Sequence, residues 1–133
     1  MPNLELSSLV LGTMTFGDTV DAAGAEAMLE AALDAGITHV DTANGYAGGE
    51  SERMLAGLLK GRRDRITLAT KAGMPHPDAG GHAPLSAPAL RASVDGSLAR
   101  LATDHVELFY LHQPDRATPV SYTHLTLPTT PYV

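Results

Sequence analysis

Residues 37–60, "ITHVDTANGYAGGESERMLAGLLK", hold the pattern that decides the fold. Their first five residues are rich in β-branched side chains and predict a short buried strand that ends at Asp41. A glycine-rich loop follows, and from about Ser51 to Lys60 apolar residues recur at the three- and four-residue spacing of a helix with one buried face. Gly61 comes next, where a left-handed residue commonly ends a helix. The stretch therefore predicts one unit of strand, loop and helix.

The same unit recurs on both sides of this stretch. Strands are predicted over residues 9–13, 66–71 and 106–111. Helices are predicted between them, one capped by Asp21 and ended at Gly36, the other capped by Ser86. The chain thus holds about four βα units, less the last helix. Such an alternation gives a parallel sheet with right-handed crossovers, either open and doubly wound or part of a barrel.

Polar residues at the strand ends favour the barrel. Asp41, Lys71 and His112 each fall at the C-terminal end of a predicted strand, where barrels build their sites. An open sheet that binds a nucleotide would want a G-x-G-x-x-G turn, and the first turn, residues 12–17 (GTMTFG), does not fit it. A complete barrel needs roughly 250 residues, and the chain has 133. The predicted fold class is therefore α/β, the N-terminal half of a (β/α)₈ TIM barrel.

Composition limits the partners of the chain. With 44% hydrophobic residues it can bury a core, while no apolar run approaches the ~20 residues of a membrane span. A net charge of −6 without a basic face argues against nucleic acid or an anionic membrane as partner, and the basic residues 60–65 are interpreted as a solvated turn. The chain has no cysteine for a disulfide framework, and its start lacks a secretory signal, which predicts a cytoplasmic protein.

Four side chains near the strand ends have complementary chemistry: Asp41, Tyr46, Lys71 and His112. A phenol is a poor proton donor at neutral pH unless a nearby ammonium stabilises the phenolate, so Tyr46 needs a lysine, and Lys71 ends the next strand. Asp41 can hold that ammonium in place, and a neutral His112 imidazole can orient a carbonyl oxygen toward the phenol. The four residues predict a site that protonates a carbonyl oxygen. A nicotinamide cofactor could supply the hydride that reduces the carbonyl carbon.

The residues around this set resemble consecutive signatures of the aldo-keto reductase family. The resemblance covers residues 4 to about 119 and is carried by four stretches in the family's order: LVLGTMTFG (9–17), HVDTANGYAGGESE (39–52), ITLATK (66–71) and VELFYLHQPD (106–115). It implies a (β/α)₈ barrel that binds NADP(H) in extended form without a Rossmann motif. A small aldehyde or ketone is the implied substrate, and no metal site is predicted.

The resemblance also implies roles for individual residues. The family's catalytic tetrad of aspartate, tyrosine, lysine and histidine falls on the four residues named above, with Tyr46 as the general acid in carbonyl reduction. The first loop of the family lies beside the nicotinamide and its ribose. The implied cofactor-binding residues are Gly12, Thr13, Met14 and Asp41.

Two segments follow from this interpretation. Residues 1–120 are a partial aldo-keto reductase domain, and residues 121–133 (SYTHLTLPTTPYV), which lack charge and helical period, are a non-family tail that is artefactual or disordered. In the family the residues that bind the cofactor phosphates come mostly from strands five to eight and their loops, which this sequence does not contain. The chain alone is therefore predicted to be inactive, and its open sheet edges predict self-association.

The remaining polar residues are interpreted as structural. His39 is expected to pack or hydrogen bond, and His76 and His82 are expected to be solvated loop residues. Glu50 and Glu52 are expected to start the second helix, where acidic side chains oppose the positive end of the helix dipole.

Three other functions fit part of the pattern. A metal-dependent barrel hydrolase would take its ligands from His39, Asp41, Lys71 as a carbamate, and His112. The pair His39 and Asp41 offers one imidazole where such sites commonly want two, and this function gives Tyr46 no role. A non-enzymatic cofactor-sensing subunit, of the kind attached to membrane channels, would keep the same fold. A lyase would use Lys71 to form a Schiff base.

Overall fold

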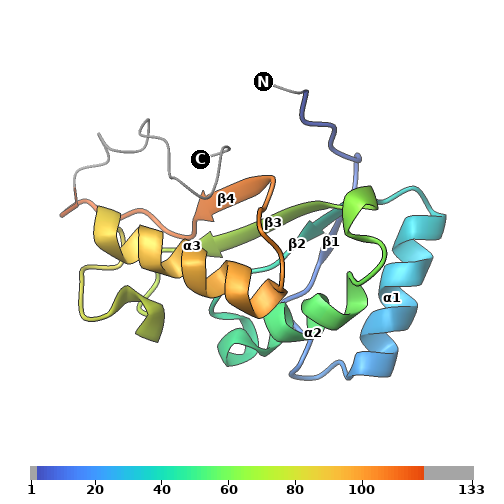
Figure 1. The fold of residues 1–133 in the computed structure, drawn as a ribbon, viewed down its shortest axis with the longest axis horizontal. Helices are drawn as coiled ribbons and strands as arrows, with labels where there is room; N and C mark the ends of the chain where they lie inside the picture. The colour runs from blue at the N-terminus through green and yellow to red at the C-terminus, as the bar shows by residue number, and fades with distance from the viewer. Residues whose placement is uncertain (1–2, 119–133) are drawn as a thin grey trace.

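The computed structural model describes residues 3–118, which form one layer of parallel strands and one layer of helices (Figure 1). The strands are β1 (Val10–Gly12), β2 (His39–Asp41), β3 (Thr67–Ala72) and β4 (Leu108–Leu111). The helices are α1 (Ala22–Asp34), α2 (Glu50–Leu58) and α3 (Ala87–Leu101). Short 3₁₀ turns lie in the connections: η1 (Tyr46–Gly49), η2 (Arg63–Arg65) and η3 (Pro77–Ala79).

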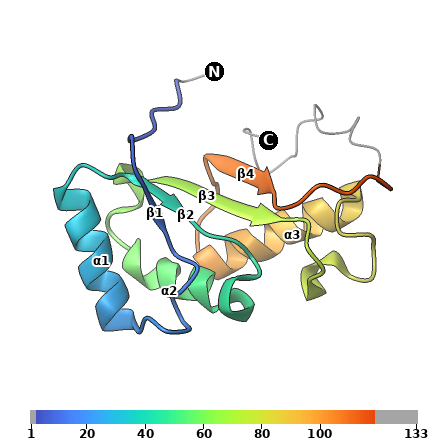
Figure 2. The same cartoon turned by 180° about the vertical axis from the view of Figure 1, so that it is seen from behind.

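The sheet has the order β1-β2-β3-β4, and each neighbouring pair is parallel. Seen from opposite sides, all three helices lie on the same face of this sheet (Figures 1 and 2). Sequential parallel strands with helices on a single face are the arrangement of half a (β/α)₈ barrel, whereas a doubly wound sheet carries helices on both faces. The predicted fold class is confirmed, and the open-sheet alternative is excluded.

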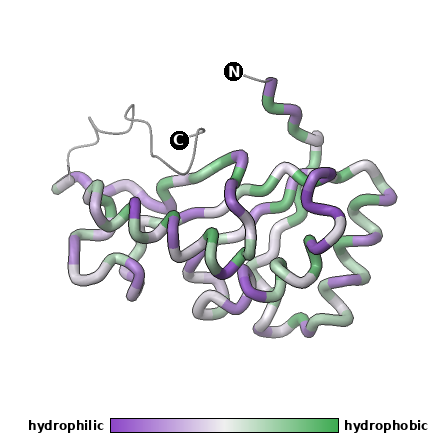
Figure 3. Tube along the Cα trace, in the orientation of Figure 1, coloured by the Kyte–Doolittle hydropathy of each residue, from purple (hydrophilic) through white to green (hydrophobic). Residues whose placement is uncertain are grey.

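The hydrophobic core lies between the sheet and its helices. Side chains alternate along each strand, and Val40, Leu68 and Phe109 point to the helix side, where they are buried. The helices supply the facing layer, which includes Leu29, Leu55, Leu58, Leu90, Val94 and Leu101. Along α1 hydrophobic and hydrophilic positions alternate, as a helix with one buried face requires (Figure 3). The opposite face of the sheet, here called the inner face, carries none of the helices of residues 3–118.

The predicted helix starts are confirmed. The Asp21 carboxylate accepts a hydrogen bond of 2.9 Å from the backbone N–H of Gly24, and the Ser86 hydroxyl accepts one of 3.4 Å from that of Ala89. Each bond satisfies an N–H group at the first turn of a helix, where no carbonyl of the helix itself is available. None of the helices within residues 3–118 has the length and apolar character of a membrane span.

Two connections differ from the prediction. α2 ends at Leu58, earlier than expected, because the Lys60 N–H bonds the Gly57 carbonyl and closes a turn. The loop after β3 contains η3, and the His76 imidazole caps it by accepting the N–H of Asp78 at 3.1 Å. The His76 side chain is only 13% exposed. The prediction of a solvated His76 is therefore wrong, since its ring is used inside the loop.

The basic turn before β3 is also less solvated than predicted. Arg63 donates to the Glu107 carboxylate at 3.0 Å and to the carbonyls of Ile66 and His105 at 2.9 Å each. Its side chain is 16% exposed. Arg63 therefore ties the start of β3 to the segment before β4, while Arg65 is exposed as expected.

Gly17 holds the loop after β1 against the start of α2. Its φ of +82° lies in the left-handed region, and a Cβ placed on it would lie 2.8 Å from the Cβ of Glu50. Both conditions exclude a side chain unless the loop moves, because left-handed backbone and a contact this short each oppose an added carbon.

Gly17→Ala should destabilise the fold by about 1–3 kcal/mol, because it adds a strained φ and a clash with the rigid start of α2. Gly57→Ala is the matched control. Gly57 lies inside α2 with no atom within 4 Å of an added Cβ, so alanine should stabilise the chain by about 0.5–1 kcal/mol. Urea midpoints measure both changes. Equal midpoints for Gly17→Ala and the parent would show that the loop adjusts freely.

Candidate active site

Strands β2 and β3 bring Asp41 and Lys71 together at their carboxyl ends. Their neighbours Val40 and Thr70 are buried on the helix side, so alternation directs Asp41 and Lys71 to the inner face. The Lys71 ammonium Nζ lies 2.5 Å from Asp41 Oδ2 and donates to the Thr42 carbonyl at 3.0 Å. The lysine and aspartate side chains are 16% and 24% exposed, so water screens the pair only in part.

Tyr46 reaches the same ammonium from the loop after β2. Lys71 Nζ donates to the Tyr46 hydroxyl at 3.1 Å and lies 4.9 Å from the ring centroid. The backbone after the tyrosine is left-handed at three successive residues, with φ of 50° at Ala47, 63° at Gly48 and 95° at Gly49. Glycine suits two of these positions because it has no Cβ. The chain thereby reverses between the phenol and the start of α2.

His112 follows β4 and contacts the phenol. The His112 and Tyr46 ring centroids are 5.8 Å apart with the planes at 87°, an edge-on contact. The His112 N–H bonds the Ala72 carbonyl at 2.8 Å, which continues the β3–β4 pairing beyond the strand. Burial lowers the pKa of His112 and the charge of Lys71 lowers it further, while Asp41 opposes the change. The imidazole is therefore neutral at pH 7, when one ring nitrogen donates and the other accepts.

The first-loop residues predicted to bind the cofactor differ in their exposure. A Cβ on Gly12 would meet no atom within 4 Å, and Met14 is 63% exposed. Thr13 is fully buried, and its hydroxyl donates to the Asp41 carbonyl at 3.0 Å and lies 2.9 Å from the Ser51 hydroxyl. Gly12 and Asp41 are partners in the strand register, so the open space above Gly12 lies beside Asp41 of the tetrad. These residues fit a flat ring that approaches over Gly12 and Met14, with Thr13 as internal support.

Behind the site lies a charged contact that the sequence analysis missed. Glu52 has no exposed surface, and its carboxylate accepts from Arg100 Nε at 2.7 Å and from the Thr70 hydroxyl at 2.6 Å. The prediction that Glu52 simply opposes the dipole of α2 is therefore incomplete. One local signal was available, because Glu52 shares the helical spacing of the buried residues Leu55 and Leu59.

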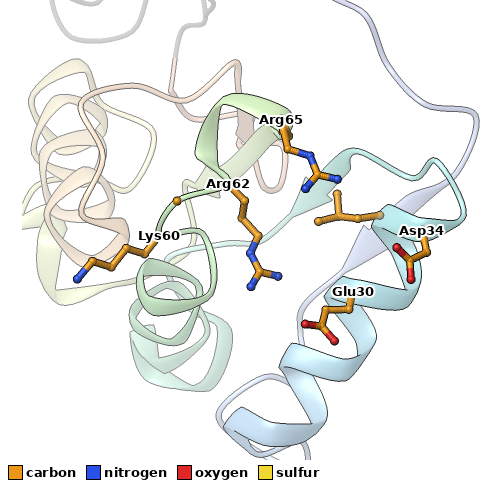
Figure 4. Close-up of a pocket in the computed structure, with 7 residues that line it drawn as sticks. Glu30, Asp34, Lys60, Arg62 and Arg65 are labelled. Carbon is orange, nitrogen blue, oxygen red and sulfur yellow. The ribbon is translucent and has the colours of Figure 1, made fainter.

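Two hollows of the described surface lie at the amino ends of the strands, away from the tetrad. The first, of about 570 Å³, opens between the end of α1 and the turn after α2, and Figure 4 shows its lining. Acidic and basic side chains line it together: Glu30, Asp34, Lys60, Arg62 and Arg65. The second, of about 500 Å³, lies under the segment before β1 and the start of β3. No tetrad residue lines either hollow, since the tetrad occupies the open inner face.

The fold and this site define a class of protein. The chain matches the model of the aldo/keto reductase family over residues 8–129, and it belongs to that family. It is 43% identical over 117 residues to human aflatoxin B1 aldehyde reductase member 2 and 40% identical over 124 residues to 6-dehydroglucose reductase of Agrobacterium fabrum. Two solved structures of a proposed aldo-keto reductase from Pseudomonas aeruginosa superpose with TM-scores of 0.73 and 0.74, at 38% and 39% identity.

The matches cover most of this chain and a smaller part of its relatives. The human and Agrobacterium matches cover 86% and 84% of this chain, but 31% and 41% of those proteins. The Pseudomonas structures are covered to 43% and 44% by 85% of this chain. The chain thus spans less than half the length of these relatives. The predicted boundary between residues 1–120 and the tail 121–133 lies outside the described residues and stays a prediction.

The lowered pKa of His112 predicts how stability depends on pH. The pKa of an ordinary histidine is 6.5, and the pKa of His112 in the folded chain is lower. As the pH falls through 6.5, the unfolded chain therefore binds a proton before the folded chain does, and this favours unfolding. We expect the urea midpoint to fall between about pH 7.5 and about pH 5.5. The fall should be smaller in His112→Gln. His82→Gln, which alters an exposed loop histidine, should keep the parent's dependence. The same fall in His112→Gln and the parent would contradict this account.

Proposed function

We propose that a barrel containing this chain reduces aldehydes or ketones with NADPH, with Tyr46 as the proton donor. The observation that carries the proposal is the contact of Lys71 Nζ with both the Tyr46 hydroxyl, at 3.1 Å, and the Asp41 carboxylate, at 2.5 Å. An ammonium beside a phenol stabilises the phenolate that proton donation leaves behind, and the carboxylate holds the ammonium in place. Two of the relatives are themselves named as reductases, one of an aldehyde and one of a dehydroglucose.

The proposed reaction places one hydride and one proton on a carbonyl group. NADPH, when bound, supplies the hydride to the carbonyl carbon. The Tyr46 hydroxyl gives its proton to the carbonyl oxygen as negative charge develops there, and Lys71 stabilises the resulting phenolate. A neutral His112 imidazole, whose ring stands edge-on to the phenol, donates a hydrogen bond to the same oxygen. The alcohol leaves, and the phenolate regains a proton from water.

The first loop would hold the nicotinamide end of the cofactor. Gly12 leaves the space beside Asp41 free of side chain, and Met14 presents an exposed apolar side chain. Thr13 supports the loop from within, since its hydroxyl is bonded to the Asp41 carbonyl. The preference for NADPH over NADH is part of the proposal and comes from the family resemblance.

The contacts of Lys71 favour reduction over the alternatives that need a neutral lysine nitrogen. A bridging carbamate or a Schiff base forms only on an unprotonated amine. Here Nζ lies among the Asp41 carboxylate, the Thr42 carbonyl and the Tyr46 hydroxyl, a setting that suits an ammonium. Within residues 3–118 no group of three or more histidine, aspartate and glutamate side chains gathers closely enough to hold a metal ion. A cofactor-sensing subunit would share this geometry, and turnover separates it from a reductase.

Tyr46→Phe tests the proposal in a complete barrel made by joining residues 1–118 to the C-terminal half of the Pseudomonas relative. We expect reduction of 4-nitrobenzaldehyde to fall by at least about 100-fold. NADPH affinity, measured by fluorescence titration, should stay unchanged because the phenol does not hold the cofactor. The control is Arg91→Met, which alters an exposed position of α3 on the helix side of the sheet and should keep full turnover. If Tyr46→Phe retains more than about a tenth of the turnover, another group donates the proton.

We also propose that the 133-residue chain alone self-associates and does not reduce carbonyls. β1 and β4 are the edges of the sheet, and Leu9, Val10 and Tyr110 at these edges are 64%, 49% and 42% exposed. Unpaired edges and exposed apolar side chains favour pairing with a second copy. Sedimentation should therefore give a mass above the 13.9 kDa of one chain. A monomer that binds NADPH at micromolar concentration and reduces 4-nitrobenzaldehyde would overturn both statements.

A further inference from the structure

Arg100 of α3 joins two elements behind the sheet. Its Nε donates to Glu52 of α2 at 2.7 Å, and its Nη1 and Nη2 donate to the two carboxylate oxygens of Asp78 at 3.2 Å and 2.7 Å. The three side chains are buried or nearly so, with 13% of Arg100, none of Glu52 and 16% of Asp78 exposed. Burial lowers the pKa of Arg100, but the hydrogen bonds and the negative charges of Asp78 and Glu52 together raise it by more, so the guanidinium stays charged.

One path leads from Arg100 to the lysine of the tetrad. The second oxygen of Glu52 accepts the Thr70 hydroxyl at 2.6 Å. Thr70 precedes Lys71 in β3 and points to the opposite face of the strand. Holding Thr70 from the helix side therefore fixes the backbone from which Lys71 extends over the inner face.

A second path leads from Arg100 to the tyrosine. The left-handed turn after Tyr46 ends at Gly49, and a Cβ placed on Gly49 would lie 3.1 Å from Arg100 Cδ. The backbone of Gly49 thus rests directly on the aliphatic part of the arginine. Ala47 in this turn has a φ of 50°, which is unfavourable for a residue with a Cβ and persists only where the surroundings hold it. Arg100 contacts the same turn two residues farther on, at Gly49.

Only an arginine fits these contacts. Its planar guanidinium offers donors on three separate nitrogens to Glu52 and to both oxygens of Asp78, whereas the three donors of a lysine share one nitrogen and cannot reproduce this planar geometry. Space for the second carboxylate comes from Gly96 on the same helix, where a Cβ would lie 2.6 Å from Asp78 Oδ2. The side chains of α3 therefore leave room for the Arg100 guanidinium to lie between the carboxylates of Glu52 and Asp78.

We propose that Arg100 is a positioning residue that fixes Lys71 and Tyr46 relative to each other from behind the sheet. It touches neither the substrate nor a reacting atom. The inference rests on the proposed function for the identity of the reacting pair, but its test requires no turnover. A failed reductase assay and a failed positioning test are therefore separate results.

The test follows the contact between the Lys71 side chain and the Tyr46 ring by nuclear Overhauser effects in the 133-residue chain, where Lys71 Nζ lies 4.9 Å from the ring centroid. Arg100→Lys and Arg100→Met both remove the guanidinium group. Arg91→Met, at an exposed position of α3, is the matched control, and Asp78→Asn weakens the η3 contact while it leaves Glu52 and Gly49 in place. Circular dichroism and the urea midpoint report on the fold of each variant.

In Arg100→Met we expect the signal between Lys71 and Tyr46 to fall at least about twofold, because loss of the residues that support a site moves it by about 0.5–1 Å. Arg100→Lys should show a smaller fall in the same direction, while Arg91→Met and Asp78→Asn should match the parent. If Arg100→Met does not fold, the comparison of Arg100→Lys with Asp78→Asn decides. An unchanged signal in Arg100→Lys and Arg100→Met, or an equal fall in Asp78→Asn, would overturn the proposal, because the arginine would then act on stability alone.

Discussion

The contact between the Lys71 ammonium and the Asp41 carboxylate is the constraint on which the site depends. A partly buried cation needs a close anion, and these two meet because β2 and β3 are parallel neighbours with Asp41 opposite Ala69 and Lys71 two residues farther on the same face. A slip of either strand by one residue would turn one of the charges to the helix side. The same slip would expose Val40 or Leu68, which are buried there. Ion pairing on one face and apolar packing on the other therefore select the same register.

The sheet separates two kinds of polar chemistry. On the inner face the tetrad gathers around one ammonium, with a neutral imidazole and a phenol at its side. On the helix side the carboxylate of Glu52 is fully buried and satisfied by Arg100 and Thr70. Successive residues of β3, Thr70 and Lys71, belong to the two sets. A buried network that is fully bonded is rigid, and this one lies one peptide away from Lys71, the lysine of the proposed reaction.

The sequence analysis succeeded where local pattern decides. The strands, the caps at Asp21 and Ser86, and the meeting of Asp41 with Lys71 follow from periodicity and from the geometry of parallel strands. It failed for Glu52, whose partner Arg100 is 48 residues away and comes near only when α2 and α3 pack. The cap formed by the His76 ring was also missed, since loop composition indicates solvation and not the direction of one side chain. The roles of the tetrad residues remain predictions, because proximity alone does not show turnover.

The placement of the core has a consequence for biosynthesis. Within residues 3–118 the buried core joins the sheet to the three helices, and each strand pairs with the next strand along the chain. Each strand therefore pairs with one that left the ribosome shortly before it, so the sheet can grow strand by strand during synthesis. In a full-length relative, such a half can pack its core while later strands are still being translated. The lysine, aspartate and tyrosine would then be assembled on the nascent chain, and the last strands would close over a site that already exists.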